Sequence, residues 1–144
     1  MEAIELLRTR RSVIARNLSD PGPSEEELAV IIESGIRTPD HGKIGPWRVQ
    51  IVTKEGQNAL GDVFSEVFQK EHGERATDAM IEFEKQRPKR APALLIVTSN
   101  ILVPHKIPEM EQKLSGGAFC MNILNAAHAL GYSAQWLTEW VAYN

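Results

Sequence analysis

The chain has 144 residues, of which 42% are hydrophobic and 24% are charged, and its formal net charge is -3 at pH 7. This length is enough for one domain with a hydrophobic core, so we expect residues 1–144 to form a single domain. The charge gives no sign of the basic surface that nucleic acids or anionic membranes attract. The sequence shows no secretory signal and no run of roughly 18 apolar residues that could span a membrane. The single cysteine, Cys120, excludes an internal disulfide, and together these features predict a cytoplasmic protein.

Two helices and a strand are predicted in the first third of the chain. Apolar spacing predicts a short amphipathic helix over 3–9. After a turn-rich stretch, Ser24 and Glu27 form a capping-box pattern, which predicts a helix that ends near Gly35. Alternating and then β-branched residues predict a strand over 47–52. The apolar faces predicted for the two helices consist of Ile4, Leu6 and Leu7 in the first and Leu28, Ile31 and Ile32 in the second.

The middle of the chain shows two further helical patterns and a buried strand. Apolar residues at three-and-four spacing predict a helix over 57–70. A loop over 73–75 then leads to a more polar helix over 76–86. The apolar run over 93–98 is continuous, which predicts a strand that is covered on both faces.

A long helix and a last strand are predicted near the end of the sequence. The helix over 109–130 is apolar around most of its circumference, which is typical of a helix at the centre of a fold or at an interface. Gly131 is suited to the position just after its C-terminus. The stretch over 132–137 reads as a third strand. Three strands and about five helices in this order predict the α+β class.

Histidine, serine and cysteine patterns give no support for several common kinds of site. The sequence has neither a Walker loop nor a nucleophile-elbow motif. None of its four histidines is spaced four residues from another, so we predict no metal site. What remains is a set of four local features, each with a structural alternative.

The first feature is the stretch "RTRRS", which follows the first predicted helix. Adjacent guanidinium groups with a neighbouring hydroxyl are suited to a phosphate or an anionic ring edge. Taken alone, a solvated basic turn is the better interpretation.

The second feature is the loop "TPDHGKIGPW", in which prolines and glycines hold Asp40, His41 and Lys43, preceded by Arg37. Loops that a scaffold fixes often carry function. An ordinary charged surface loop is an equally good interpretation of this pattern.

The third and fourth features lie in the long helix and after it. Gly116 and Gly117 each cost a helix about 1 kcal/mol relative to alanine, which is tolerated where a ligand, a partner or another helix approaches closely. Simple helix packing explains them about equally well. Trp136 would stand at the end of the third predicted strand, where a ligand often binds, although a core aromatic is the simpler interpretation.

Together and in this order, the four features resemble the FMN-dependent nitroreductase family, in particular its compact YdjA-type branch. The matching segments cover the whole chain, and their order and spacing carry the resemblance rather than any single motif. They are Arg10-Arg11-Ser12, "RTPDHGKIGPW" from Arg37 to Trp47, "EQKLSGG" from Glu111 to Gly117, and "GYSAQWLT" from Gly131 to Thr138.

The resemblance implies an α/β/α sandwich with a mixed, mainly antiparallel sheet, built as an intertwined homodimer with FMN at the interface. It implies an oxidoreductase that passes electrons from NADH or NADPH through flavin N5 to a nitroaromatic, a quinone or a similar acceptor by a ping-pong mechanism. The flavin carries this chemistry, so no catalytic side chain is implied. The implied flavin-binding residues are Arg10, Arg11 and Ser12 from one subunit, Arg37 and His41 from the other, and Trp136, Leu137 and Thr138 at the strand end.

Three departures from the family pattern keep an alternative open. Gly45 stands where a glutamine is usual, and Leu137 stands where an arginine is usual. The C-terminal helix and strand of the family are expected beyond Asn144 and are missing from the sequence. The alternative is a dimeric module that binds a flavin or another ligand without reductase turnover. A small nucleic-acid-binding domain that uses "RTRRS" is a third interpretation, which the net charge disfavours.

Overall fold

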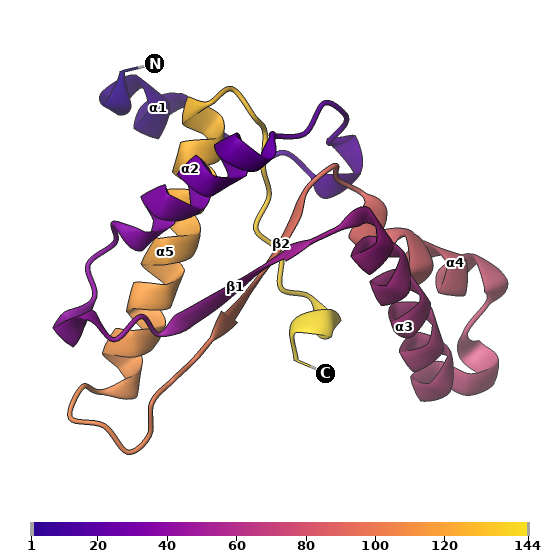
Figure 1. Cartoon of the computed structure of the whole chain (residues 1–144). Helices are drawn as coiled ribbons and strands as arrows, with labels where there is room; N and C mark the ends of the chain where they lie inside the picture. The colour runs from indigo at the N-terminus through magenta and orange to yellow at the C-terminus, as the bar shows by residue number, and fades with distance from the viewer. Residues whose placement is uncertain (1, 144) are drawn as a thin grey trace. The chain divides into compact units, whose positions relative to one another are not determined.

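The computed structural model describes residues 2–143 (Figure 1). They divide into two compact units. The first unit consists of residues 2–14, Pro23–Gln50 and Ile96–Trp136. The second unit consists of Ala15–Gly22, Ile51–Leu95 and residues 137–143.

Helix α5, Glu109–Ala129, is the central element of the first unit. Helix α2, Glu25–Ile36, begins at Ser24 with the predicted capping box and packs on α5. A methyl group on Gly35 of α2 would lie 2.8 Å from the Phe119 ring of α5, and Phe119 is fully buried. Glycine therefore lets the two helices approach closely.

Helix α1, Ala3–Thr9, lies near the C-terminal end of α5 (Figure 1). Its predicted apolar face is not buried, because Ile4 is 67% exposed and Leu7 is 59% exposed. Only Leu6 is half-buried. The prediction of an amphipathic helix is correct for the helix itself, but the described residues do not cover its apolar side.

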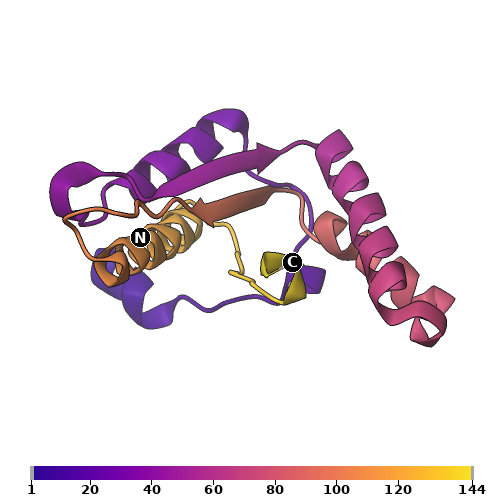
Figure 2. The same ribbon diagram turned by 90° about the horizontal axis from the view of Figure 1, so that it is seen from below.

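The sheet of the described chain has two strands, β1, Trp47–Val52, and β2, Leu94–Ser99. They run in opposite directions, and each passes from one compact unit into the other (Figures 1 and 2). The structure confirms the α+β class. Strand β2 is half-buried rather than covered on both faces, and its last two residues are exposed, so the expectation of full cover is wrong.

The predicted third strand over 132–137 is wrong, since these residues form no strand. Their alternation is typical of a strand, but a strand forms only where a neighbour offers a repeating ladder of hydrogen bonds. Here the Ala134 oxygen accepts from the Val13 N–H at 3.2 Å, outside the sheet.

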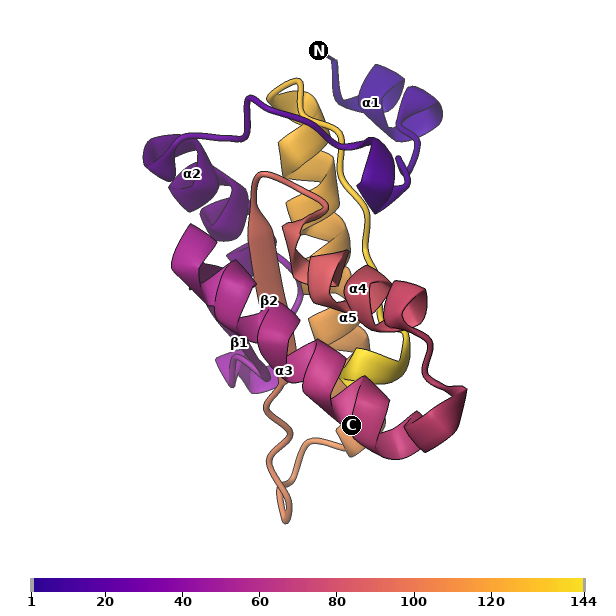
Figure 3. The same ribbon diagram turned by 90° about the vertical axis from the view of Figure 1, so that its right-hand side faces the viewer.

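The second unit contains helices α3, Lys54–His72, and α4, Asp78–Gln86, which lie side by side (Figures 1 and 3). Thr53 and Thr77 cap them, so α3 starts three residues before the predicted boundary and α4 starts two residues after it. A methyl group on Gly61 of α3 would lie 2.3 Å from the Lys85 oxygen of α4. The predicted loop over 73–75 is a short 3₁₀ turn.

A buried carboxylate joins α4 to the end of the described chain within the second unit. Arg87 Nε and Nη2 donate to Glu84 at 2.6 and 2.7 Å, and Trp140 Nε1 donates to the same carboxylate at 3.0 Å. Arg87 also pairs with Glu139. Burial by itself would raise the pKa of Glu84, but the hydrogen bonds from Arg87 and Trp140 and the charge of Arg87 outweigh it and hold this pKa below its ordinary value.

Among residues 2–143, no helix is both long enough and apolar enough to cross a lipid bilayer.

Candidate functional site

The Arg10–Ser12 stretch follows α1 directly. Arg10 is the C-cap of α1 and donates its N–H to the Leu6 oxygen at 2.9 Å. Its side chain is half-buried, and its Nη1 atom is buried without a hydrogen-bond partner among the described residues. Arg11 and Ser12 are exposed. The stretch therefore offers a desolvated cationic donor beside an exposed hydroxyl and a second guanidinium.

Two contacts hold this stretch against the end of α5 and the segment after it. His128 Nε2 lies 2.8 Å from the Arg11 oxygen. The Val13 N–H donates to the Ala134 oxygen. These contacts fix the stretch at the C-terminal end of α5. The contacted Ala134 stands two residues before Trp136 in the sequence.

The loop between α2 and β1 is fixed at the other end of α5. His41 Nδ1 lies 2.7 Å from Glu111 Oε2, and Ser115 Oγ donates to the Pro39 oxygen at 2.6 Å. Both ring and carboxylate of the His41 pair are largely exposed. Within the loop, Asp40 accepts from the Gly45 N–H at 2.7 Å.

The sharp turn in this loop depends on left-handed backbone conformations. Gly42 has φ 73°, Lys43 has φ 53° and Gly45 has φ 58°. Glycine adopts such angles without steric cost, whereas most other residues adopt them rarely. No atom lies within 4 Å of a methyl group built on Gly45, so its backbone rather than its surroundings calls for glycine.

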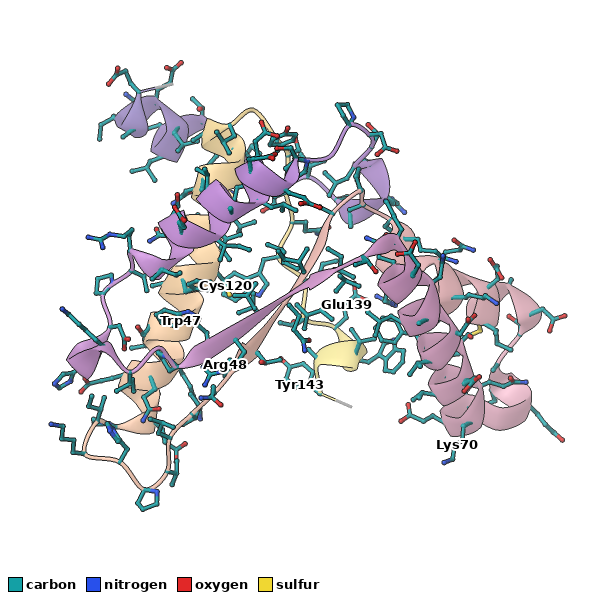
Figure 4. All side chains as sticks on the ribbon, in the orientation of Figure 1. Trp47, Arg48, Lys70, Cys120, Glu139 and Tyr143 are labelled. Carbon is teal, nitrogen blue, oxygen red and sulfur yellow. The ribbon has the colours of Figure 1, made fainter. Side chains whose placement is uncertain are left out.

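Strand β1 begins where this loop ends. Trp47 stacks on Phe119 of α5 with ring centroids 4.8 Å apart, and Figure 4 shows Trp47 beside α5. The Asn100 N–H donates to the Pro46 oxygen at 3.0 Å. Arg37, the C-cap of α2, is exposed at the start of the loop.

Two of the predicted groups of site residues therefore lie at opposite ends of α5, and one chain does not bring them together. Arg10–Ser12 is held at His128, whereas His41 is held at Glu111. These two contact points are 17 residues apart on α5. At 1.5 Å per residue, the separation along the helix is roughly 25 Å.

The third predicted group follows the end of α5. Trp136 is 49% exposed and Leu137 is 44% exposed, and Thr138 is exposed too. A methyl group on Gly117 would lie 3.8 Å from the Trp136 ring, so Trp136 lies beside the middle of α5. Trp136 is thus not the core aromatic of the simpler interpretation. Leu137 and Thr138 belong to the second unit.

The paired glycines of α5 are not required by packing within the chain. A methyl group on Gly116 would have its nearest neighbours at 4.0 Å, and one on Gly117 at 3.8 Å, both ordinary contacts. This differs from Gly35 and Gly61, where a methyl group would collide with a neighbour. Simple helix packing within one chain therefore does not explain the pair.

Several residues that support these groups were not found from the sequence. Gln112 is buried and ties the 102–107 segment to α5 through bonds with Leu102 and Ile107. Asn125 Oδ1 and Thr38 Oγ1 are buried without a hydrogen-bond partner in the described part of the chain. For Asn125 the available signal was a polar residue in an apolar stretch of the helix, whereas Gln112 stands between Glu111 and Lys113 and gives no such signal. Nothing in the sequence marks Thr38 as a buried polar residue.

Comparisons with known proteins show the family of the chain. The model of the nitroreductase family matches residues 7–143. "Putative NAD(P)H nitroreductase YdjA" of Escherichia coli K12 is 34% identical over 139 residues, which cover 94% of this chain and 72% of that protein. "Putative NAD(P)H nitroreductase" of Haemophilus influenzae is 33% identical over 152 residues, which cover 98% and 75%.

Several solved structures have a fold similar to that of this chain. A nitroreductase-like family protein from Bacillus cereus superposes with a TM-score of 0.79 at 22% identity, covering 100% of this chain and 73% of that one. A nitroreductase with bound FMN from Desulfitobacterium hafniense gives 0.61 at 20% identity, covering 90% and 65%. These likenesses confirm the predicted nitroreductase-like α+β fold.

Proposed function

The chain belongs to the nitroreductase family, and we propose that it is an FMN-dependent oxidoreductase that takes electrons from NADH or NADPH and passes them to a nitroaromatic, a quinone or a similar small acceptor. Bound FMN would supply the hydride and electron chemistry at its N5 atom, in a ping-pong sequence. The protein's own residues bind and orient the ligands, and no side chain is assigned as an acid or a base.

The observation that carries this proposal is the placement of two predicted half-sites at opposite ends of α5. The roughly 25 Å between them exceeds the length of a flavin ring system. We propose that a homodimer completes the site, with Arg10–Ser12 of one subunit facing the partner subunit's Arg37 and the partner subunit's His41. This arrangement explains why a single chain presents both halves on its surface.

The residues of the first half-site fit FMN on their own chemistry. Arg10 Nη1 is a buried donor without a partner among the described residues, which is a costly state unless a ligand accepts its hydrogen bond. A guanidinium suits both the flavin phosphate and the electron-rich edge of the pyrimidine ring. A cation at that edge stabilises negative charge on the flavin.

The remaining predicted residues fit the same ligand. The pairing with Glu111 orients the His41 ring. Trp136, Leu137 and Thr138 are exposed and offer apolar and hydroxyl surface for lining the flavin. Gly116 is buried, but Gly117 is half-buried and carries no side chain, which suits the approach of a flat ligand or a partner helix at that position.

Anaerobic titration of the purified protein with NADH and NADPH tests the proposal. We expect the flavin absorbance to bleach with one or both donors and to return on addition of a quinone or a nitroaromatic, with parallel lines in double-reciprocal plots. Flavin absorbance that neither donor bleaches would favour the alternative, a flavin-binding module without turnover. The departure at Leu137 and the unusual Gly45 motivate that alternative.

A further inference from the structure

The imidazole ring of His128 contacts two carbonyl oxygens. Its Nδ1 atom lies 2.7 Å from the Leu124 oxygen in the preceding turn of α5. Its Nε2 atom lies 2.8 Å from the Arg11 oxygen, which belongs to the stretch after α1. Both distances are those of good hydrogen bonds.

A carbonyl oxygen can only accept a hydrogen bond. A neutral imidazole has one N–H, so it can serve only one of the two oxygens and would set a lone pair against the other. The cationic ring has two N–H groups and serves both. His128 also lies in the last turn of α5, where the helix dipole favours a cation.

The charged groups near His128 are compatible with a cationic imidazole ring. Helix α5 carries no acidic or basic side chain other than His128 between residues 114 and 130. The titratable and charged groups on α1 and α2, which pack against α5, and just after α5 fall into three sets. In and beside α1 they are Glu2, Glu5, Arg8, Arg10 and Arg11, and on α2 they are Glu25, Glu26, Glu27 and Glu33. The third is Tyr132, whose hydroxyl donates to Glu27. The hydrogen bonds from the Ser24 backbone and from Tyr132 lower the pKa of Glu27, which keeps a carboxylate on this side.

We propose that His128, in its doubly protonated form, is the positioning residue for the Arg10–Ser12 stretch. Its ring clamps the Arg11 carbonyl to the end of α5 and so fixes the direction in which Arg10 and Ser12 point. The consequence for flavin binding rests on the proposed function, whereas the clamp itself does not. Loss of one ring proton releases one of the two carbonyls and loosens the stretch.

His72 is a matched control in the same chain. Its Nδ1 atom also lies near the carbonyl four residues earlier, at 3.0 Å from the Phe68 oxygen, and its ring stacks on Phe68. It belongs to α3, in the second unit, whereas His128 belongs to α5 in the first. Replacing it removes a similar local contact without touching the clamp.

Three variants and two measurements test the clamp. We would compare His128→Gln, His128→Phe and His72→Gln with the unchanged protein between about pH 5.5 and 8.5, a range that covers ordinary histidine titration. The first measurement is ¹⁵N NMR of the histidine rings together with hydrogen exchange of the Val13 amide, corrected for its intrinsic rate. The second is the dissociation constant of added FMN.

In the unchanged protein we expect both His128 nitrogens to carry protons at the acidic end, and Val13 protection to fall as the ring loses one. FMN binding should weaken by roughly tenfold or more over the same change, as for loss of a hydrogen bond to a charged group. Both His128 variants should lose this change of FMN affinity with pH, and His128→Phe should bind FMN more weakly than His128→Gln. The His72→Gln variant should keep the change of affinity with pH.

A singly protonated His128 ring at the acidic end, or Val13 protection equal in all four proteins, would overturn the clamp. If the ring and Val13 behave as expected but no protein binds FMN, the proposed function fails while the clamp stands. If FMN binds and its affinity is the same in the His128 variants at every pH, the role in positioning the flavin site is refuted.

Discussion

The Trp47 indole stacks on the Phe119 ring with centroids 4.8 Å apart and planes inclined by 17°. This contact joins the start of β1 to the middle of α5. Gly35 of α2 approaches the same Phe119 ring. One buried ring thus fixes a strand and a helix on α5, and the loop that carries His41 runs between them.

Phe119→Ala should lower the free energy of unfolding by about 3–5 kcal/mol, because it removes a fully buried ring and leaves a cavity. Urea denaturation at neutral pH measures this loss. Leu114→Ala on the same helix is the control, since Leu114 is 65% exposed and its loss should cost less than about 0.5 kcal/mol. Equal losses for the two variants would contradict the central position of Phe119.

Most of the secondary structure follows from local sequence. The strand over 47–52 and the helix over 3–9 have the predicted bounds, and Ser24 with Glu27 forms the predicted capping box. These features depend on neighbouring residues, which a sequence displays directly. The Thr53 and Thr77 caps were missed, and they account for the displaced starts of α3 and α4.

Features that depend on distant partners were predicted less well. The stretch over 132–137 was predicted as a strand, yet no strand forms there, and the Ala134 oxygen accepts from the Val13 N–H outside the sheet. Likewise, the resemblance names Arg10 and His41 as flavin residues, but only the structure shows that they lie at opposite ends of α5. Their roles toward FMN stay predictions.

Gly61→Ala should destabilise the second unit, since the added methyl group would lie 2.3 Å from the Lys85 oxygen and a backbone atom cannot easily give way. Thermal unfolding should show a clearly lower midpoint than in the unchanged protein. A midpoint that is unchanged or raised would contradict the close approach of α3 and α4.

Gly117→Ala, unlike Gly61→Ala, should not lower the stability of the flavin-free protein. The added methyl group meets only the Trp136 ring at 3.8 Å, and alanine favours a helix over glycine by up to about 1 kcal/mol. The variant should be as stable as the unchanged chain or more so, while FMN affinity falls. Unchanged affinity, measured by fluorescence quenching of FMN, would show that no ligand approaches the helix at this point.

Glu84 should make the protein sensitive to acid. Its pKa is lowered in the folded state, so it contributes stability above its ordinary value of 4.5, and this contribution is lost as the pH falls below that value through the folded pKa. Glu84→Gln should flatten the acid side of a plot of unfolding free energy against pH. Glu66→Gln, at an exposed position of α3, is the control and should keep the slope. A slope unchanged in Glu84→Gln would refute the role of the buried carboxylate.

Arg10→Ala should weaken FMN binding by roughly 10- to 100-fold, as for a lost charge-assisted hydrogen bond, with little change in the unfolding of the flavin-free protein. The small change is expected because Arg10 Nη1 has no hydrogen-bond partner in the described chain. His41→Ala should weaken binding as well. Calorimetric titration with FMN and denaturation of the same samples separate the two effects, and equal loss of fold and flavin would contradict the assignment.

Mixed dimers test whether the two residues serve the same flavin across the interface. One subunit would carry Arg10→Ala and the other His41→Ala, which leaves one site with both residues intact and one with neither. Such dimers should bind half the flavin of the unchanged dimer with unchanged affinity. Two equally weakened sites would place both residues on the flavin of their own subunit.

The visible spectrum of the purified protein, recorded with its molecular mass in solution, tests the central claim most directly. We predict a yellow dimer with flavin absorbance, or a colourless one that gains it with equimolar FMN and keeps it through gel filtration. A protein that stays colourless and retains no FMN after such treatment would contradict the account.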